Sequence, residues 1–174
     1  KKVLLIDKGH SIYKRNWPIL NKWLTKCPIN KEGVSGCHPA CSITSGFGGA
    51  GAYSDGKFNI TSEFGGWMTE YLDNDVVEEL INYVDSINLS HGATPKITDP
   101  TTSKVKEIEK RGLAVGLKLL RAKVRHLGTE ENLQILKSIF EDLDKLIDMR
   151  YLTEVKDVLV ENGSIKGVML NSTI

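Results

Sequence analysis

The glycine-rich stretch GFGGAGAYSDGK, from Gly46 to Lys57, contains the residues whose types and spacing point most directly to chemistry. It formally matches G-x-G-x-x-G at Gly46, Gly48 and Gly51, a spacing that binds a pyrophosphate when a strand precedes it and a helix begins after it. The flanks do not fit, because the three residues before Gly46 hardly form a strand and those after Gly51 favour turns. We interpret the glycines instead as a loop whose backbone passes within contact of a flat ring or a phosphate, where a Cβ atom would clash. A purely structural loop is the alternative.

A second candidate is the carboxylate of Asp7, which closes the short apolar run that starts at Lys2 and is followed by Lys8 and Gly9. Such a run is typical of a buried parallel strand. In dinucleotide-binding βαβ units, the acid at the tip of the second strand accepts hydrogen bonds from the ribose hydroxyls of the adenosine half. Asp7 with its neighbours is compatible with that role, and the alternative is an aspartate that merely suits a turn.

Three cysteines and a histidine precede the glycines, and they could supply four soft metal ligands: Cys27, Cys37, His38 and Cys41. Their spacing lacks the paired C-x-x-C of ordinary zinc sites, so free thiols are the favoured interpretation. A redox role would require a lowered thiol pKa. A non-catalytic module that binds a metal or a partner through these four residues is the alternative. An odd number of cysteines fits a reducing compartment better than a secreted disulfide framework.

A small basic cluster precedes Gly128, and it consists of Arg121, Lys123, Arg125 and His126. Charges that alternate along a strand usually lie on a solvated face, and this is the favoured interpretation. The alternative is that Arg125 holds an anion or a substrate carboxylate while His126 acts as an acid or base near neutral pH.

These residues must be positioned by elements that the hydrophobic pattern predicts. After the first strand, the pattern favours a short or broken helix over residues 11–24 and a loop over 25–66. Asp73 is a good N-cap for a helix that ends at Gly92, and Thr129 caps a second strong helix. Between them we expect a charged helix from about Thr101 to Leu113 and a strand over residues 117–126. The runs 149–160 and 165–170 are joined through Asn-Gly, the strongest short hairpin signal.

The bulk composition bounds the class of protein. The 174 residues are 40% hydrophobic and 26% charged, which is near the globular average and argues against disorder. A net charge of +1 gives no broad basic field for nucleic acid or an anionic membrane. No apolar run is long enough to span a bilayer, so we expect a cytoplasmic protein. The chain opens on a strand without a methionine and stops just after another strand, which suggests an interior fragment.

The motifs taken together resemble one protein family. The order is a strand ending in DKG, a Cys-rich loop, GGAGAYSDGK, a helix with EELINYVD, then AKVRHLGTE and a terminal hairpin TEVKDVLVENGSIKGV. It resembles the FAD-dependent dehydrogenases, often described as NAD(FAD)-utilising dehydrogenases, within the flavoproteins that have two dinucleotide-binding domains. The likeness covers almost the whole chain. GGAGAYSDGK and VRHLGT are specific to the family, whereas DKG and the hairpin are shared widely among flavoproteins.

The resemblance implies an α/β fold that is part of a Rossmann-like FAD-binding domain, with an inserted helical and mixed region and a C-terminal β-hairpin. The implied boundaries are 1–72 for the FAD-binding part, 73–128 for the insertion on the substrate side, and 129–174 for the helix and hairpin. By the same likeness, Asp7 with Lys8 would bind the adenosine ribose of FAD and Val155 would meet the adenine. The backbone of four residues would lie close to the flavin: Gly48, Gly49, Ala50 and Gly51. The implied reaction is hydride transfer through FAD, with NAD(P)H as a candidate electron donor.

Overall fold

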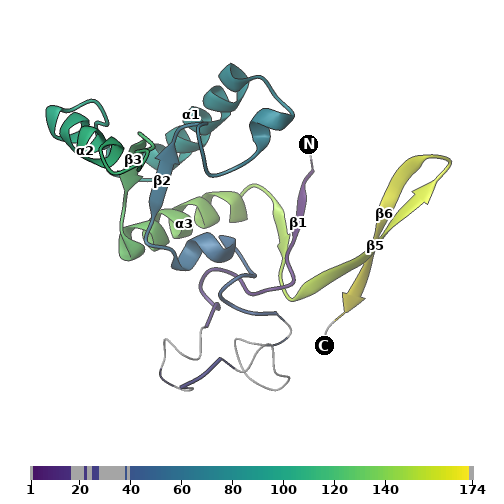
Figure 1. The fold of residues 1–174 in the computed structure, drawn as a ribbon. Helices are drawn as coiled ribbons and strands as arrows, with labels where there is room; N and C mark the ends of the chain where they lie inside the picture. Colours follow the sequence, from purple (N-terminus) through teal and green to yellow (C-terminus); the bar gives the residue numbers. More distant parts are fainter. Residues whose placement is uncertain (1, 17–21, 23–24, 28–37, 39, 173–174) are drawn as a thin grey trace. The chain divides into compact units, whose positions relative to one another are not determined.

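The structure, a computed structural model, describes residues 2–16, 22, 25–27, 38 and 40–172 (Figure 1). Within these residues the fold is mixed α/β, with three α-helices and three two-stranded sheets. The chain divides into two compact units, which are described separately. Unit 1 comprises Lys1–Tyr53 and Leu136–Ile174, and unit 2 comprises Ser54–Ile135. The segment 73–128, expected as an insertion, lies inside unit 2.

Unit 1 is built around a parallel pair of strands. β1 (Leu4–Ile6) pairs with β4 (Asp148–Arg150), and Leu4 lies opposite Asp148. The apolar run before Asp7 was expected to be a buried parallel strand. The parallel pairing is confirmed, but the strand is only partly buried, because Leu4 is 46% exposed. After β4 the chain forms an antiparallel hairpin of β5 (Thr153–Glu161) and β6 (Ser164–Ser172).

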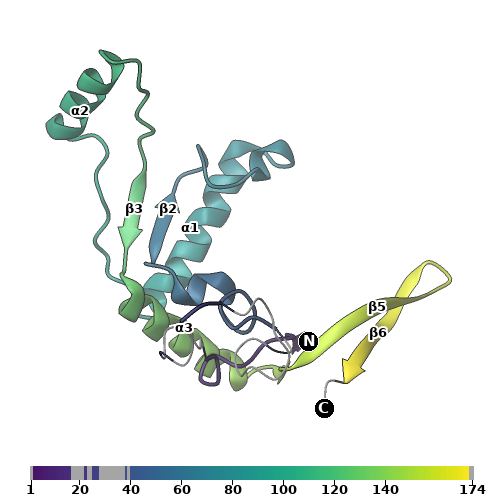
Figure 2. The same ribbon diagram turned by 60° about the horizontal axis from the view of Figure 1, so that its bottom comes forward.

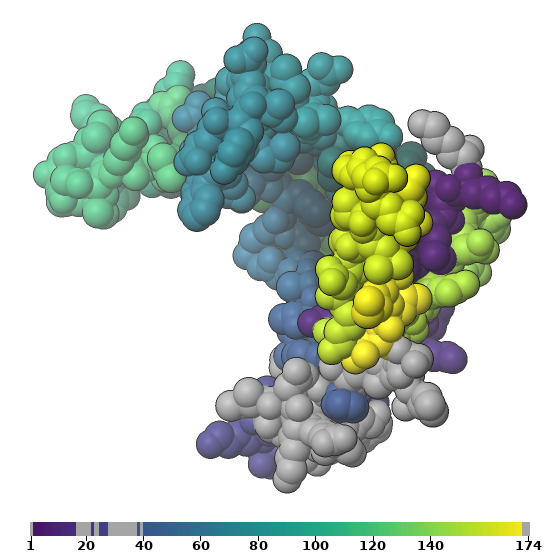
Figure 3. Space-filling view, turned by 90° about the vertical axis from the view of Figure 1, so that its right-hand side faces the viewer, coloured from purple at the N-terminus to yellow at the C-terminus, as the bar shows by residue number. Residues whose placement is uncertain are grey.

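The hairpin turn follows from its sequence. Asn162 and Gly163 both have positive φ, 50° and 72°, as a two-residue type I′ turn requires. The predicted hairpin is therefore confirmed, although Met149 and Arg150 belong to the separate strand β4. Apolar side chains such as Val158 and Ile165 are exposed on it, and Figure 3 shows the hairpin in yellow at the molecular surface.

The core of unit 1 contains a cluster of aromatic rings around Phe140, which lies on α3 (Thr129–Asp144) and is buried. Tyr13 and Phe47 meet the Phe140 ring edge to face, with centroids 5.6 and 5.1 Å away. Tyr151 follows at 6.3 Å in a tilted arrangement. Such geometry adds to the stabilisation from burial alone.

The Tyr151 phenol gives this cluster a pH dependence. Burial, followed by the charges of Asp144 and Asp7, raises the pKa of Tyr151 from 10.0 to about 12. The folded state keeps the phenol neutral to a higher pH than the unfolded chain, so we expect stability to be intact below pH 10 and to fall as the pH rises towards 12. Urea unfolding followed by circular dichroism across this range tests the expectation. Tyr151→Phe should fall less steeply, and an identical slope in both proteins would contradict the assignment.

Unit 2 packs α1 (Asn74–Ser90) along the antiparallel pair of β2 (Lys57–Ile60) and β3 (Lys123–His126), as Figure 2 shows. The helix turns Val77 inward, as its apolar spacing predicts. Asp73 is the N-cap residue, but its side chain makes no capping hydrogen bond. Gly92, with φ of 97°, follows the C-cap, as expected.

The second and third helices also begin close to where the sequence predicts. In α2 (Ser103–Leu113), the Thr102 hydroxyl accepts a hydrogen bond from the Val105 N–H at 3.4 Å. The helix α3 starts at Thr129 in unit 2 and continues into unit 1. Among the described residues, no helix combines the length and apolar character that crossing a membrane would require.

Two predicted elements were too long, and a third lies partly outside the described residues. The predicted loop 25–66, part of which lies outside the described residues, was too long, because its described part contains β2 and the 3-10 helix η1 (Gly49–Tyr53). A second 3-10 helix, η2 (Met68–Glu70), follows it. The predicted strand 117–126 was also too long, because only residues 123–126 pair with β2. Half of the residues in the predicted broken helix over 11–24 lie outside the described residues. Its described start forms a turn in which Lys14 and Arg15 donate to the Ser11 carbonyl.

Candidate functional site

Asp7 lies at the carboxyl end of β1, where its backbone and its side chain both form hydrogen bonds. Its N–H donates to the Arg150 carbonyl, and its carbonyl accepts from the Thr153 N–H at 3.0 Å. Its carboxylate Oδ1 accepts the Gly9 N–H at 2.6 Å and the Gly46 N–H at 3.0 Å. Oδ2 has no hydrogen-bond partner among the described residues. Two backbone donors thus orient the carboxylate while one of its oxygens stays available.

Gly9 and Gly46 are brought together by this carboxylate, and their backbones touch. A Cβ atom at Gly9 would lie 2.3 Å from the Gly46 nitrogen. Gly46 has φ of +100°, and a Cβ atom there would lie 2.5 Å from the His10 carbonyl oxygen. Both positions therefore require glycine for reasons internal to unit 1.

Arg15 fixes the segment that leads into the glycine-rich stretch. Its buried guanidinium donates to three backbone carbonyls, those of Ser42 (2.9 Å from Nε), Ile43 (2.9 Å) and Phe47 (2.7 Å). It also lies 4.9 Å from the centre of the Tyr53 ring, within the range of a cation–π interaction. Burial lowers the pKa of Arg15, and the nearby Tyr53 opposes that shift. The guanidinium holds the loop in shape through main-chain contacts.

Of the four residues expected to lie beside a flavin, Gly48 directly precedes η1 and the other three are its first residues. Gly48 has φ of +82°, and a Cβ atom there would lie 3.0 Å from the Leu136 side chain. Gly49 also has positive φ, whereas Gly51 does not, and a Cβ atom at either position would meet nothing within 4 Å. Ala50 is exposed next to them. Within the described residues, packing and backbone geometry thus explain Gly48 and Gly49, but they give no reason for glycine at 51.

The other two residues assigned to the cofactor lie in the same unit. Lys8 is exposed beside Asp7. Val155 pairs with Leu170 in the hairpin, just before an irregularity in register that leaves Lys156 without a partner residue. A bulge of this kind re-aims the strand locally. The roles of Lys8 and Val155 at a cofactor stay predictions.

Arg125 differs from the favoured interpretation of the basic cluster, because it is buried and not solvated. It is only 4% exposed, and its Nε and Nη2 donate to the two carboxylate oxygens of Asp85, each at 2.7 Å. Its Nη1 donates to the Thr94 carbonyl at 2.5 Å. The hydrogen bond to Asp85 raises the pKa of Arg125. The carboxylate that Arg125 holds is thus supplied by the protein, which gives this residue a structural role in unit 2.

His126, the other catalytic candidate, is exposed at the end of β3, opposite Lys57 on β2. The Lys57 ammonium, 2.6 Å from the Asp55 carboxylate, lowers the pKa of that carboxyl, and the charge of His126 contributes to a smaller extent. An acid–base role for His126 stays a prediction.

The predicted metal ligands are only partly described. Cys27 is an exposed free thiol, Cys41 is a half-buried free thiol, and His38 is exposed. Cys37 lies outside the described residues. In the part of the chain that the structure describes, no three ligand-type side chains gather as a metal would require. The metal-binding alternative stays a prediction because one of its four residues is not covered.

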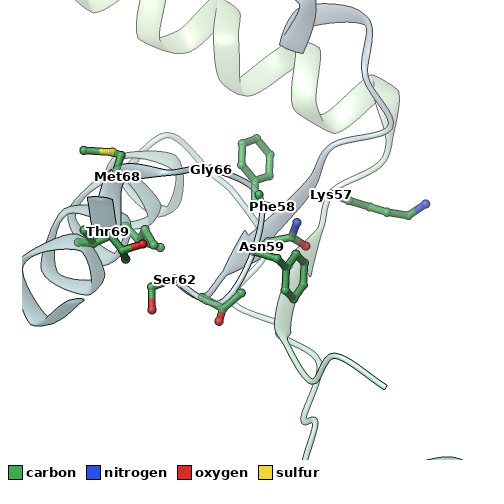
Figure 4. A pocket seen from close by; sticks show the side chains of 12 residues that line it. Lys57, Phe58, Asn59, Ser62, Gly66, Met68 and Thr69 are labelled. Atoms are coloured by element: carbon green, nitrogen blue, oxygen red, sulfur yellow. The ribbon is translucent and has the colours of Figure 1, made fainter. Parts of the chain in front are cut away.

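Unit 2 also contains a pocket that the sequence did not reveal. It lies between α1, β2 and η2 and has a volume of about 300 Å³. Figure 4 shows Phe58 and Asn59 on one side of it and Met68 and Thr69 on the other. The alternation of Phe58 and Ile60 is the only sequence signal for this wall, and it is too short to predict a strand.

The chain was compared with models of protein families and with curated proteins, and neither comparison gave a match.

Proposed function

We propose that this chain contributes to an FAD-dependent oxidoreductase, in which Asp7 accepts hydrogen bonds from the adenosine ribose and the backbone around Gly51 lies beside the flavin ring. The proposal combines the resemblance of the motifs with one observation that carries it. That observation is the carboxylate of Asp7 at the carboxyl end of a parallel strand pair, held by two N–H groups through one oxygen. Ligands of open parallel sheets bind outside the carboxyl ends of the strands.

The hydrogen bonding of Asp7 supports this role for a physical reason. Oδ1 is engaged by Gly9 and Gly46, so the side chain is fixed before any ligand arrives. A pre-oriented acceptor loses little conformational entropy on binding. Oδ2 is then the atom that would accept from a ribose hydroxyl.

Gly51 supports the second half of the proposal. Nothing within 4 Å would meet a Cβ atom at this position, and its φ is not in the left-handed region. A ligand that approaches the backbone closely is a sufficient reason for glycine there. Bound FAD would supply hydride transfer to or from a small-molecule substrate, with NAD(P)H as candidate donor, while these residues bind and orient. A Rossmann-like domain around β1 and β4 belongs to the same proposal.

The test uses the complete native protein and the variant Asp7→Asn. We expect the native protein to show the visible absorbance bands of oxidised flavin, either as purified or after FAD is added. In Asp7→Asn, the amide oxygen can still accept from Gly9 and Gly46, but the second oxygen is lost as an acceptor. FAD affinity should fall about tenfold to a hundredfold, the range for one hydrogen bond to a charged group.

The control is Asp148→Asn, which removes the same charge from an exposed residue on β4. This variant should keep the native affinity for FAD. A colourless native protein that ignores added FAD would overturn the function, whereas equal affinities of native protein and Asp7→Asn would overturn the role of Asp7 alone.

A further inference from the structure

The pocket between α1, β2 and η2 is one part of a longer cleft that runs along α1 in unit 2. A second cavity of about 230 Å³ adjoins the first, and five residues line both: Phe58, Asn59, Met68, Val77 and Ile81. The second cavity continues along the helix past Val84 to Asp85 and Asn88. The combined space is within the size range of small-molecule sites.

The two charged residues that line this cleft, Lys57 and Asp85, each pair with an opposite charge. Asp85 is 8% exposed, and both of its carboxylate oxygens accept from Arg125. Lys57 pairs with Asp55, and Figure 4 shows its side chain extending away from Ser62, Met68 and Thr69. A charged ligand would lose its hydration here without gaining a free counter-ion, which is costly. The cleft therefore favours an uncharged ligand.

Asn88 adds a polar group to the apolar wall. It is only 7% exposed and lines the second cavity. No side-chain hydrogen bond of Asn88 is found among the described residues, whereas buried carboxamides are normally satisfied. Its backbone carbonyl is occupied, because it accepts from the N–H groups of His91 and Ala93. Asn88 thus lines the cavity with a side-chain amide that has no hydrogen-bond partner among the described residues and whose nitrogen and oxygen are not fully enclosed by protein atoms.

We propose that this cleft binds an uncharged, largely apolar small molecule that carries a carbonyl or hydroxyl group, with the Asn88 amide as its hydrogen-bond partner. The apolar part of the ligand packs against Phe58, Met68 and Ile81. The inference uses contacts inside unit 2 alone and does not depend on flavin binding.

Four probes that share one naphthalene ring test the chemistry by calorimetric titration of the 174-residue chain. Two of them, 2-acetylnaphthalene and 2-naphthylmethanol, carry an uncharged polar group. At least one of these should bind about tenfold more tightly than 2-ethylnaphthalene, the effect of one net hydrogen bond. The charged 2-naphthoate should bind most weakly. If 2-naphthoate binds as well as the neutral probes, or if none of the four binds, the proposal fails.

Two variants locate the site. Val84 lines the cleft and is 54% exposed, and its neighbour Tyr83 is 63% exposed but lines none of the described cavities that adjoin the cleft. Val84→Glu should weaken binding of the neutral probes at least about tenfold by placing a charge at the apolar wall, whereas Tyr83→Glu should leave it unchanged. Equal effects of the two variants would place the probes elsewhere.

Asn88→Leu tests the hydrogen bond itself. Because no described residue hydrogen-bonds to the Asn88 amide, the variant breaks no hydrogen bond within unit 2, and we expect it to fold about as stably as the native chain, which thermal unfolding checks. The polar probes should lose their advantage over 2-ethylnaphthalene. An advantage that persists in folded Asn88→Leu would contradict the role of Asn88.

Discussion

Replacing Arg125 with methionine is expected to destabilise unit 2 by about 3–5 kcal/mol, the cost of leaving one charge of a buried pair without its partner. The pair joins β3 to α1 through two hydrogen bonds of 2.7 Å, and both residues are buried. Arg125→Met would leave the Asp85 carboxylate uncompensated and the Thr94 carbonyl without its donor. Hydrogen exchange at amides of β3 and α1 measures the loss in unit 2 itself.

The matched control keeps the volume but removes both charges. Arg125→Met combined with Asp85→Leu should recover most of the lost stability, because no buried charge then lacks a partner. Arg121→Met breaks an ion pair with Glu109 whose side chains are both partly exposed, and it should change stability little. A native-like stability of the single variant Arg125→Met would show that the pair is not closed in solution.

Gly9→Ala is expected to destabilise unit 1 by about 3 kcal/mol or more, since the new methyl group would overlap backbone and not a flexible side chain. The Cβ atom would lie 2.3 Å from the Gly46 nitrogen and 2.6 Å from the Ser45 carbonyl carbon. Relief would require the two backbone segments to separate, which would also break the hydrogen bonds to Asp7. Hydrogen exchange at the amides of β1 and β4, measured at increasing urea concentrations, gives the change in the free energy of unfolding of unit 1.

Gly51→Ala is the matched substitution in η1 of the same unit. A Cβ atom there meets no described atom within 4 Å, so folding stability should stay the same or rise slightly. If the backbone at Gly51 contacts the flavin, the same variant should weaken FAD binding by the complete native protein. Destabilisation of Gly51→Ala equal to that of Gly9→Ala would show that the glycine serves the fold.

The helices and the hairpin could be predicted because their signals are local. The apolar spacing of α1, the glycine at 92 and the Asn162–Gly163 turn each depend on neighbours in sequence. The same holds for the parallel strand before Asp7, whose apolar run is continuous. The mixed α/β class follows from these elements.

The missed features depend on contacts between distant residues. β2 has only four residues, and its pairing with β3 defines it. Arg125 looked like part of a solvated face because its partner Asp85 lies 40 positions away on another element. The position of Asn88 in a cavity likewise depends on β2 packing against α1. The hydrophobic periodicity of the sequence does not indicate contacts between residues so far apart.

The division into two units also has a consequence for the order in which the chain becomes ordered. Unit 2 is continuous in sequence, so all its partners are present once residue 135 has been synthesised. β1, by contrast, is made first, and its partner strand β4 is made only after the whole of unit 2. Contacts between distant positions form slowly because a long loop must close. During synthesis, the backbone of Asp7 would therefore gain its partners Arg150 and Thr153 late, after both residues of the Arg125–Asp85 ion pair are present.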